Sequence, residues 1–373
     1  MEFICIMTNN KRNCIIKKLH YGILISLMVV SCDLFESNNN DGPSDKVYVA
    51  LQGLDQVAIV NVNSSEIDFV DIDYATMSDQ GSHTPHFIEI DEINRFWFVT
   101  TISSGYVGLY NLDTDAFIDT IMVGDMPALM ALNEEDKKLY VSRMMPMGTM
   151  GMGAVSTIVQ EINYEDSSRM VLSNEFELSS PAPHGIAINT DGSELYVVSN
   201  TADWLYKINS ETGDSLLAPM DSLINYIDPS IEVKRLRPIQ CISLEDSLLL
   251  ISCSGGIHTD PWMGQQDTII GQVQLWNTNT MSLKDMVQFS WKSRPWHIIN
   301  SPLNDEVFVA LGGDVIYPGS AGVACLTYTS DTLAIKWETY SEDFEGLHGI
   351  DVSEDGESLF VSGREDGNLH IFN

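Results

Sequence analysis

The chain repeats one pattern of apolar and polar residues six times. The clearest copy, APHGIAINTDGSELYVVSN at 182–200, has an apolar segment opened by Pro-His, a turn carrying Asp191 and Gly192, and a second apolar segment. β-Branched and aromatic residues on both sides of an Asp-Gly turn predict a hairpin within a buried sheet. The other copies begin at Thr84, Met126, Arg237, Arg294 and Gly346.

A second pattern follows the hairpins. Apolar and polar residues alternate and end in Asn before a Ser, Thr or Asp, as in VGLYNLDTDA from Val107 and WLYKINSETG from Trp204. This alternation predicts a third strand whose end carries an Asx turn. A fourth strand, such as FIDTIMVGDMP at 117–127, then leads to the next opening strand. Each repeat therefore predicts four antiparallel strands.

Repeats of four strands predict an all-β protein, a β-propeller, because each sheet is apolar on both faces and must be covered by its neighbours. Residues 46–373 are expected to form this single domain. The first segment supplies three strands without an opening strand, and the last supplies three without a closing strand. If each terminal segment counts as a blade, the chain forms a seven-bladed propeller of four-stranded antiparallel blades. If the two terminal segments together form one blade, the propeller has six blades, which is the alternative.

Two short elements add a family resemblance. The LYVV segment of the repeat and VGDMP at 123–127 resemble the YVTN-repeat propellers, a wide family of bacterial exported proteins. The resemblance covers the chain from Lys46 to Asn373. It implies the propeller fold and leaves the activity open.

Residues 1–31 have the pattern of an export signal. A basic region precedes an apolar run of ten residues, Tyr21–Val30, which is too short for a permanent membrane helix and typical of a signal-peptide core. The run ends in VVSC, which resembles the lipobox of bacterial lipoproteins and implies cleavage before Cys32 and lipid attachment to its sulfur. An ordinary secretory signal is the alternative. Residues 32–45 are polar and predict a flexible tether.

The lipobox resemblance implies a lipoprotein of the bacterial cell envelope, periplasmic or at the outer membrane or surface, that contacts the membrane through its lipid anchor only. The formal net charge of −34 supports solubility and argues against a nucleic-acid partner, since phosphates bind through Lys and Arg. The protein is expected to be a monomer. An odd number of cysteines in apolar segments of the propeller predicts buried free thiols at Cys241, Cys253 and Cys325.

The opening strand of each blade lines the central channel of a propeller, so its first residues form a ring around one mouth. The six aligned opening positions are His86, Ala128, His184, Gln240, His297 and His348. Imidazoles that converge on an axis are suitable ligands for a transition metal such as copper, with Gln240 as an added candidate. The other interpretation is structural: each histidine bonds a nearby backbone carbonyl, and the ring reflects the shared descent of the repeats.

Two loops add candidates on the same face. The loop RMMPMGTMGMG contains Met144, Met145, Met147, Met150 and Met152, and the loop SGGIHTDPWMGQQD contains His258, Trp262 and Met263. Thioethers favour Cu(I), but methionines also form adaptable apolar surfaces for partners. Four arginines are expected on this face, either to hold a carboxylate or phosphate or to neutralise nearby acids: Arg143, Arg237, Arg294 and Arg364.

A histidine-lined channel also resembles the propeller of nitrous oxide reductase, where histidines carry copper, and the haem-binding propeller of cytochrome cd1 nitrite reductase. Ala128 and Gln240 interrupt the ring, which argues against a full multi-copper cluster. The chain has no CxxCH for covalent haem and no GxSxG, P-loop or Rossmann fingerprint, so no motif identifies an enzyme. Three functions remain: a module that binds a protein or small-molecule ligand at the channel mouth, a metal protein with or without redox activity, and a structural envelope component.

Overall fold

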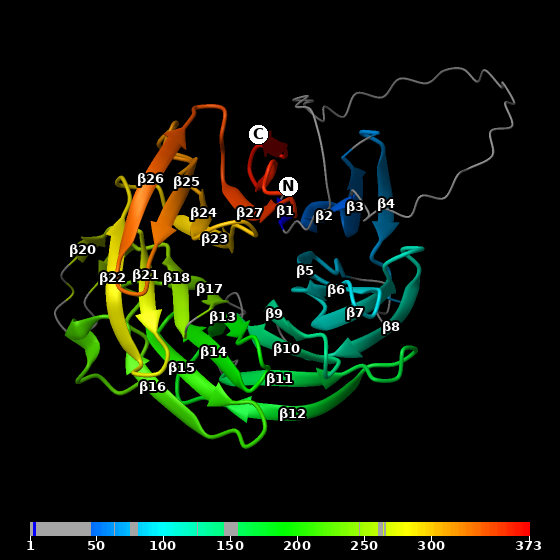
Figure 1. Ribbon diagram of the computed structural model, residues 1–373, viewed down its shortest axis with the longest axis horizontal. Helices are drawn as coiled ribbons and strands as arrows, with labels where there is room; N and C mark the ends of the chain where they lie inside the picture. The colour runs from blue at the N-terminus through cyan, green and yellow to red at the C-terminus, as the bar shows by residue number, and fades with distance from the viewer. Residues whose placement is uncertain are drawn as a thin grey trace, which may run out of the picture.

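The computed structural model describes residues 3–4, 46–62, 64–74, 81–124, 126–144, 156–245, 247–259, 264 and 266–373. The protein is a seven-bladed β-propeller of antiparallel sheets arranged around a central channel (Figure 1). The predicted count of seven blades is confirmed, and the six-bladed alternative is wrong.

Blades two to six each contain four strands that run outward from the channel in chain order. Blade two is β5 (Pro85–Asp91), β6 (Phe96–Thr101), β7 (Tyr106–Asn111) and β8 (Phe117–Met122). Blade three is β9 (Pro127–Asn133), β10 (Lys138–Arg143), β11 (Ile158–Asn163) and β12 (Val171–Glu177). Blade four is β13 (Pro183–Ile188), β14 (Glu194–Ser199), β15 (Trp204–Asn209) and β16 (Ser215–Pro219).

Blade five is β17 (Pro238–Leu244), β18 (Leu248–Cys253), β21 (Gln272–Asn277) and β22 (Ser282–Gln288). Between its second and third strands it carries an extra hairpin, formed by β19 (Gly256–Thr259) and β20 (Gln266–Ile269). Blade six is β23 (Pro295–Asn300), β24 (Glu306–Leu311), β25 (Gly322–Tyr328) and β26 (Leu333–Tyr340).

The first and last blades differ from the others, as the incomplete segments at the two ends of the repeat predicted. Blade one is β2 (Lys46–Leu51), β3 (Gln56–Asn61) and β4 (Ile67–Asp71), with the two-residue β1 (Phe3–Ile4) paired to β2 at the innermost position. Blade seven has three strands, β27 (Leu347–Val352), β28 (Leu359–Gly363) and β29 (Leu369–Phe372). Removal of residues 1–31 as a signal peptide stays a prediction.

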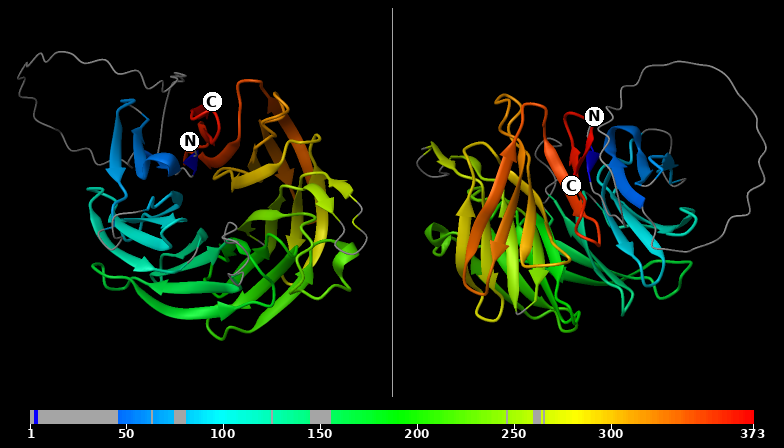
Figure 2. Two further views of the ribbon diagram at one scale, coloured as in Figure 1. Left: turned by 180° about the vertical axis from the view of Figure 1, so that it is seen from behind. Right: turned by 45° about the horizontal axis from the view of Figure 1, so that its top comes forward.

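Side-chain packing closes the ring between these two blades. Val47, Val49 and Leu51 of β2 form one apolar cluster with Phe360 of β28, and Ile371 of β29 packs against it. Figure 2 shows the first and last blades side by side at this junction. No strand of one sheet completes the other among the described residues. The junction is therefore held by apolar contacts between blades, as at the other blade interfaces.

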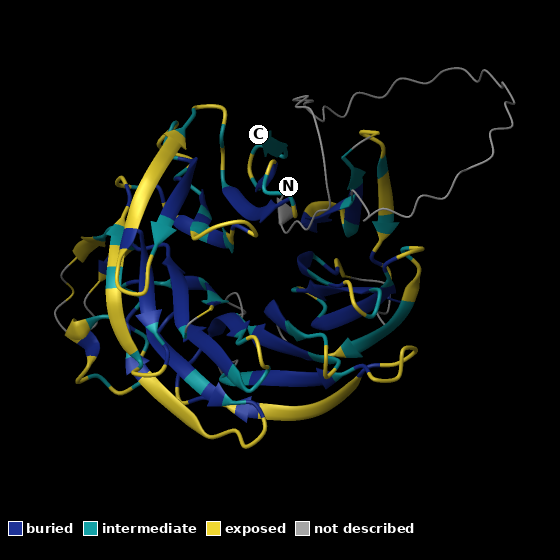
Figure 3. Cartoon of the chain, in the orientation of Figure 1, coloured by how far each residue is buried: buried dark blue, intermediate teal, exposed yellow. Residues whose placement is uncertain are grey.

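The inner strands are buried and the outermost strands are exposed (Figure 3). Second strands such as β6 are buried along their whole length, because a neighbouring blade covers each face of the sheet. The thiols of Cys241, Cys253 and Cys325 are free and buried, as the sequence predicted. In the part of the chain that the structure describes, no helix has the length and apolar character needed to span a membrane.

The start of each opening strand is set by a residue in the left-handed conformation. The φ angle of the residue before the strand lies between 49° and 63° at Thr84, Met126, Ala182, Arg237, Arg294 and Gly346. In each of these blades the carbonyl of this residue accepts the N–H just after the second strand, at 2.9 to 3.1 Å. Non-glycine residues keep this conformation only where surrounding bonds hold it. The repeated bond thus decides which side chains enter the channel.

Hydroxyl groups on the second strands join neighbouring blades. Ser142 on β10 accepts the N–H of Leu129 in its own blade at 3.1 Å and donates to the carbonyl oxygen of His184 in the next blade. Thr100 and Ser252 make the corresponding bonds in blades two and five. Each such bond contributes about 1 kcal/mol, and the repeated set holds the inner strands in place around the channel.

Candidate functional site

The strand pairing corrects the alignment of the channel residues. In blades two to seven, the first residue of the opening strand pairs with the last part of the second strand, which gives a common reference position. The residue that follows this position is, in blade order, His86, Ala128, His184, Ile239, Trp296 and His348. Gln240 and His297 stand one position further along. The predicted alignment of Gln240 and His297 with the other histidines is therefore wrong by one residue. It placed these two polar residues opposite the histidines of the other blades, whereas the strand pairing places Pro238 and Pro295 opposite Pro85 and Pro183.

Three of the predicted histidines form a cluster. The ring centres of His297 and His348 are 4.8 Å apart, and those of His86 and His348 are 6.1 Å apart. Trp296 adds a fourth ring, 4.7 Å from that of His348. Gln52, which follows β2, places its Nε2 2.7 Å from Nδ1 of His86. The cluster thus joins side chains from blades one, two, six and seven at one end of the channel.

His184 and Gln240 are instead held by the backbone. Nδ1 of His184 lies 2.6 Å from the carbonyl oxygen of Ile239, which is the structural role that the second interpretation predicted. The side-chain oxygen of Gln240 accepts the N–H of Ile298 at 2.7 Å. These contacts tie blade four to blade five and blade five to blade six.

Burial keeps the four histidines neutral, because a charged imidazole is poorly solvated in the protein interior. It lowers the pKa of His184 to about 4 and that of His297 to about 3. The pKa values of His86 and His348 also lie well below the ordinary range, through burial first and repulsion by neighbouring imidazoles second. Nε2 of His86, Nε2 of His297 and Nδ1 of His348 are buried without a hydrogen-bond partner. Such unpaired nitrogens are uncommon in proteins and mark the cluster as a candidate site.

The cluster does not form a ready metal centre. Among the described residues, no three side chains of His, Cys, Asp or Glu come together in a way that could hold a metal ion. In addition, Nδ1 of His86 is already in contact with the amide of Gln52. The copper hypothesis therefore gains no support from the geometry of these residues.

A cavity of about 300 Å³, here called the mouth cavity, lies beside the cluster between blades six and seven. Its lining includes Arg294, Trp296, His348, Arg364 and Glu365. Nη2 of Arg294 lies 2.7 Å from Oδ2 of Asp314, and Nη2 of Arg364 lies 3.1 Å from Oε1 of Glu365. Lys292 also contacts Asp314, at 3.1 Å. Lys292 and Arg294 therefore share the carboxylate of Asp314, and Arg364 contacts that of Glu365.

The two cations next to Asp314 control its ionisation. Burial alone would raise the pKa of the Asp314 carboxyl, but the hydrogen bond from Lys292 and the charge of Arg294 outweigh it and lower this pKa. Asp314 is thus ionised at ordinary pH and holds Arg294 at the rim of the mouth cavity.

The remaining predicted residues lie elsewhere. Arg237 donates to the carbonyl oxygen of Ile257 at 3.0 Å and so holds the β19–β20 hairpin, where His258 is buried with an unpaired Nδ1. Met144 packs against the core, and Arg143 lies against the segment between β8 and β9. The structure thus brings together two of the four arginines. Outside the described residues are Met145, Met147, Met150, Met152, Trp262, Met263 and Cys32.

Sequence reasoning missed two acids in the channel, Glu89 on β5 and Asp351 on β27. Both stand four residues after the first residue of their opening strand. At the same position the other four blades with an aligned opening strand have Ala131, Ala187, Ile242 and Ile299. An acid at a repeat position that is otherwise apolar was a signal in the sequence, but the abundance of Asp and Glu in this chain concealed it. Trp296 was missed because the alignment gave its position to His297.

Comparison with known proteins identifies the fold class. No family model matches the sequence, and no curated protein matches it. A chain of the crystal structure of the mitotic checkpoint complex matches with a TM-score of 0.63 and 15% identity, over 94% of this protein and 98% of that chain. Hydrazine synthase from Kuenenia stuttgartiensis matches with a TM-score of 0.67 and 12% identity, over 88% of this protein and 92% of that chain.

At such low identities the likeness shows the fold alone. The protein has a β-propeller fold, and 1374 chains of solved structures match it. Because a fold this widespread serves many functions, function must be argued from the site. The resemblance to YVTN-repeat propellers stays a prediction.

Proposed function

We propose that the protein is a binding module, which holds an acidic group of a partner protein in the mouth cavity between blades six and seven. The observation that carries the proposal is that Arg294 and Arg364, from different blades, line one cavity together with Trp296. Propellers commonly bind proteins in this way, because a rigid scaffold presents variable loops and channel mouths.

Charge favours an anionic partner group at this mouth. The whole chain has a net charge of −34, yet Lys292, Arg294 and Arg364 stand together here with two carboxylates, Asp314 and Glu365. A partner carboxylate would be attracted to these three cations. A guanidinium group binds a carboxylate through two parallel N–H bonds, which adds geometric specificity to the attraction.

Two aromatic side chains around Lys292, outside the lining of the mouth cavity, offer apolar contact. The side chains of Trp291 and Tyr317 are 52% and 41% exposed, and their rings meet edge to face at 5.3 Å. Lys292 lies over both rings. Nε1 of Trp296 has no hydrogen-bond partner and is a donor next to the arginines. Aromatic rings beside cations are typical of the residues that carry binding energy at protein interfaces.

Replacing Arg294 and Arg364 by alanine is expected to raise the Kd for an acidic peptide. We expect each substitution to contribute at least about a tenfold increase. Each substitution removes charge-assisted hydrogen bonds worth roughly 1.5–3 kcal/mol. The full chain is screened against immobilised peptides that carry Asp or Glu beside an aromatic residue. The Kd of the best binder is then measured for the wild type and for R294A/R364A.

Arg95→Ala is the matched control, since Arg95 forms an exposed ion pair with Asp113 in blade two at 2.6 Å. Equal binding by R294A/R364A and R95A would contradict the proposal. So would equal binding of peptides whose Asp and Glu are replaced by Asn and Gln. Failure of every peptide to bind would favour the structural envelope component instead.

We further propose that this module is exported and held at a membrane by a lipid on Cys32. The support is the signal-like pattern of residues 1–31 and the lipobox-like VVSC that ends it. When the full gene is expressed in a bacterium fed with labelled palmitate, label is expected on the wild-type chain and not on C32S. Equal labelling of both, or labelling of neither, would contradict lipidation.

A metal role for the channel has weaker support. The unpaired nitrogens of His86, His297 and His348 favour it. The described residues nevertheless offer no group of three ligands, so neither copper binding nor redox activity is part of the proposed function.

A further inference from the structure

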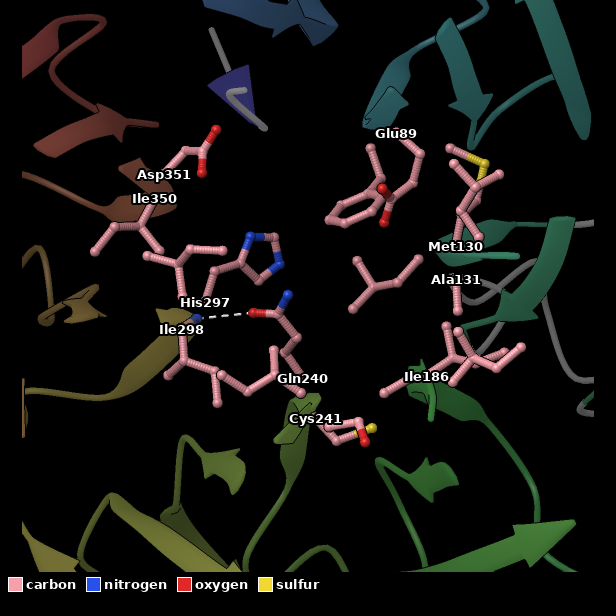
Figure 4. Close-up of a pocket in the computed structure, with 18 residues that line it drawn as sticks. Glu89, Met130, Ala131, Ile186, Gln240, Cys241, His297, Ile298, Ile350 and Asp351 are labelled. Atoms are coloured by element: carbon pink, nitrogen blue, oxygen red, sulfur yellow. Dashed lines mark hydrogen bonds between the residues drawn. The ribbon is translucent and has the colours of Figure 1, made fainter. Parts of the chain in front are cut away.

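A cavity of about 210 Å³ lies inside the channel, where the opening strands of blades two to seven form its wall. Figure 4 shows Glu89 and Asp351 on opposite sides of this cavity, and the side-chain oxygen of Gln240 is bonded to the N–H of Ile298. The two carboxyls therefore do not converge on one ligand group. A smaller cavity, next to the proposed binding site, is more informative.

This smaller cavity, here called the side cavity, has a volume of about 90 Å³ and lies between the β19–β20 hairpin and the segment before β23. The hairpin contributes Ile257 and Ile269 to its lining, and the segment contributes Trp291, Lys292 and Arg294. Arg294 also lines the mouth cavity. The two cavities therefore adjoin at the side chain of Arg294.

The β19–β20 hairpin is an addition to the repeat. Among the described residues, no other blade has a separate two-stranded sheet. The hairpin pairs with no strand of blade five, and Arg237 holds it in place, because its Nη2 donates to the carbonyl oxygen of Ile257 at 3.0 Å. Additions of this kind to a regular scaffold are common places for binding. Here the added hairpin forms one wall of the side cavity.

Large apolar side chains on both walls of the side cavity are open to solvent. Ile257 on the hairpin is 57% exposed, and Trp291 on the opposite wall is 52% exposed. Nζ of Lys292 lies 4.6 Å from the centre of the Trp291 ring, so a cation accompanies this apolar surface. Contiguous exposed apolar groups are typical of interaction sites. Together with the cations, they favour a partner segment that has both an apolar and an acidic side chain.

The size of the side cavity selects the kind of apolar group. A benzene ring occupies an engineered protein cavity of roughly 150 Å³. The side cavity is smaller, at about 90 Å³, and therefore matches a branched aliphatic side chain better than an aromatic one. Val, Leu and Ile have side chains of this kind, and their burial against apolar walls is favourable.

We infer that the side cavity binds a branched aliphatic side chain of the same partner segment whose acidic group occupies the mouth cavity. The inference rests on the proposed function and adds the second residue that the protein recognises. Arg294, where the two cavities adjoin, binds the carboxylate, and the aliphatic group packs between Ile257, Ile269 and Trp291. The partner is thus a segment in which an acidic residue and a Val, Leu or Ile stand close together in sequence.

The probes are immobilised peptides of Gly and Ser that carry one Asp and, one to three residues away, one Leu. In matched peptides Ser replaces the Leu, Asn replaces the Asp, or both are replaced. The Kd of each peptide for the full chain is measured by surface plasmon resonance. At the spacing that binds best, replacing the Leu by Ser is expected to raise the Kd of the wild type by about tenfold, because the buried aliphatic surface is lost.

I257S is expected to lose the preference for Leu over Ser, because it removes one wall of the side cavity, and to keep the preference for Asp over Asn. R294A/R364A should lose the preference for Asp. The matched control is I93S, since Ile93 is 66% exposed in the turn between β5 and β6 and lines neither cavity. I93S should bind every peptide as the wild type does.

Equal Kd values of the wild type for the Leu and Ser peptides would overturn the inference, and a remaining preference for Asp would leave the proposed function standing. This comparison needs no variant, so it holds even if I257S fails to fold. A preference for Leu that folded I257S keeps in full would also overturn the inference. A preference for Leu that I257S loses, without any preference for Asp, would support the side cavity and contradict the acidic-group proposal. Binding of none of the peptides would overturn both.

Discussion

Acidification from pH 7 to pH 4.5 is expected to unfold the protein, and the four buried channel histidines should be the main cause. Burial places the pKa of His184 at about 4 and that of His297 at about 3, and it lowers those of His86 and His348 well below the ordinary range. In the unfolded chain these histidines titrate near pH 6.5. Below that pH the unfolded state binds more protons than the folded state, so stability is complete above pH 6.5 and falls as the pH drops.

The size of the effect follows from proton linkage. Each histidine contributes a loss of about 1.4 kcal/mol per pH unit below pH 6.5, which amounts to roughly 10 kcal/mol for four histidines over two units. A typical domain has only about 5–15 kcal/mol of stability. Buried carboxyls act in the opposite sense, because a raised pKa lets the folded state hold an extra proton. The pKa is raised to about 8 at Glu89 and to about 6 at Asp203, and it is also raised at Glu92 and Glu134. These carboxyls offset part of the loss caused by the four imidazoles.

The measurement is the urea concentration at half-unfolding between pH 7.5 and 4.5, for the wild type and for H184Q. The wild type is expected to lose stability steeply below pH 6.5. H184Q should show a shallower slope, by about 1.4 kcal/mol per pH unit, because it lacks one of the four protons taken up on unfolding. A stability that stays flat from pH 7 to pH 5 would contradict the burial of neutral histidines.

Replacing Asp203 by alanine is expected to cost at least about 3 kcal/mol of folding free energy. Asp203 is fully buried, and its carboxylate accepts three backbone N–H groups from the segment before β17. The donors are Arg235 and Leu236, both at 2.8 Å, and Arg237 at 2.9 Å. Alanine would leave these N–H groups without the acceptor that links blade four to blade five, at roughly 1–3 kcal/mol each where no water replaces it.

Asp203→Asn is the matched control. Asparagine has the same shape and keeps one acceptor oxygen, which can satisfy the N–H groups of Arg235 and Leu236, so D203N is expected to lose about half as much stability as D203A. Urea denaturation at pH 7.5 gives both values. If D203A were as stable as the wild type, the segment before β17 would have to be held by other contacts.

Most of the fold could be predicted because its signals are local. The Asp-Gly turn and the two apolar segments in 182–200 specify β13, β14 and the turn between them, since turn chemistry and period-2 alternation act between near neighbours. The same reasoning found the third strand in WLYKIN, which is β15. The pairing of Phe3–Ile4 with β2 had no such signal, because it joins segments far apart in the chain.

The candidate site could be predicted only in part. The sequence placed four histidines on opening strands: His86, His184, His297 and His348. It could not distinguish a histidine bonded to a backbone carbonyl from one whose nitrogen has no hydrogen-bond partner. His184 bonds the carbonyl of Ile239, whereas His348 faces His297 and Trp296. These contacts cross from blade to blade, so they depend on how the sheets are placed around the channel.

By itself the sequence determined the strand order, the repeat and the residue types at the start of each inner strand, because these follow from interactions within one blade. Only the tertiary structure decided which side chains meet. Arg294 and Arg364 come from two blades. Their approach depends on closure of the whole ring, which is set by packing at every blade interface and by no local pattern in the chain.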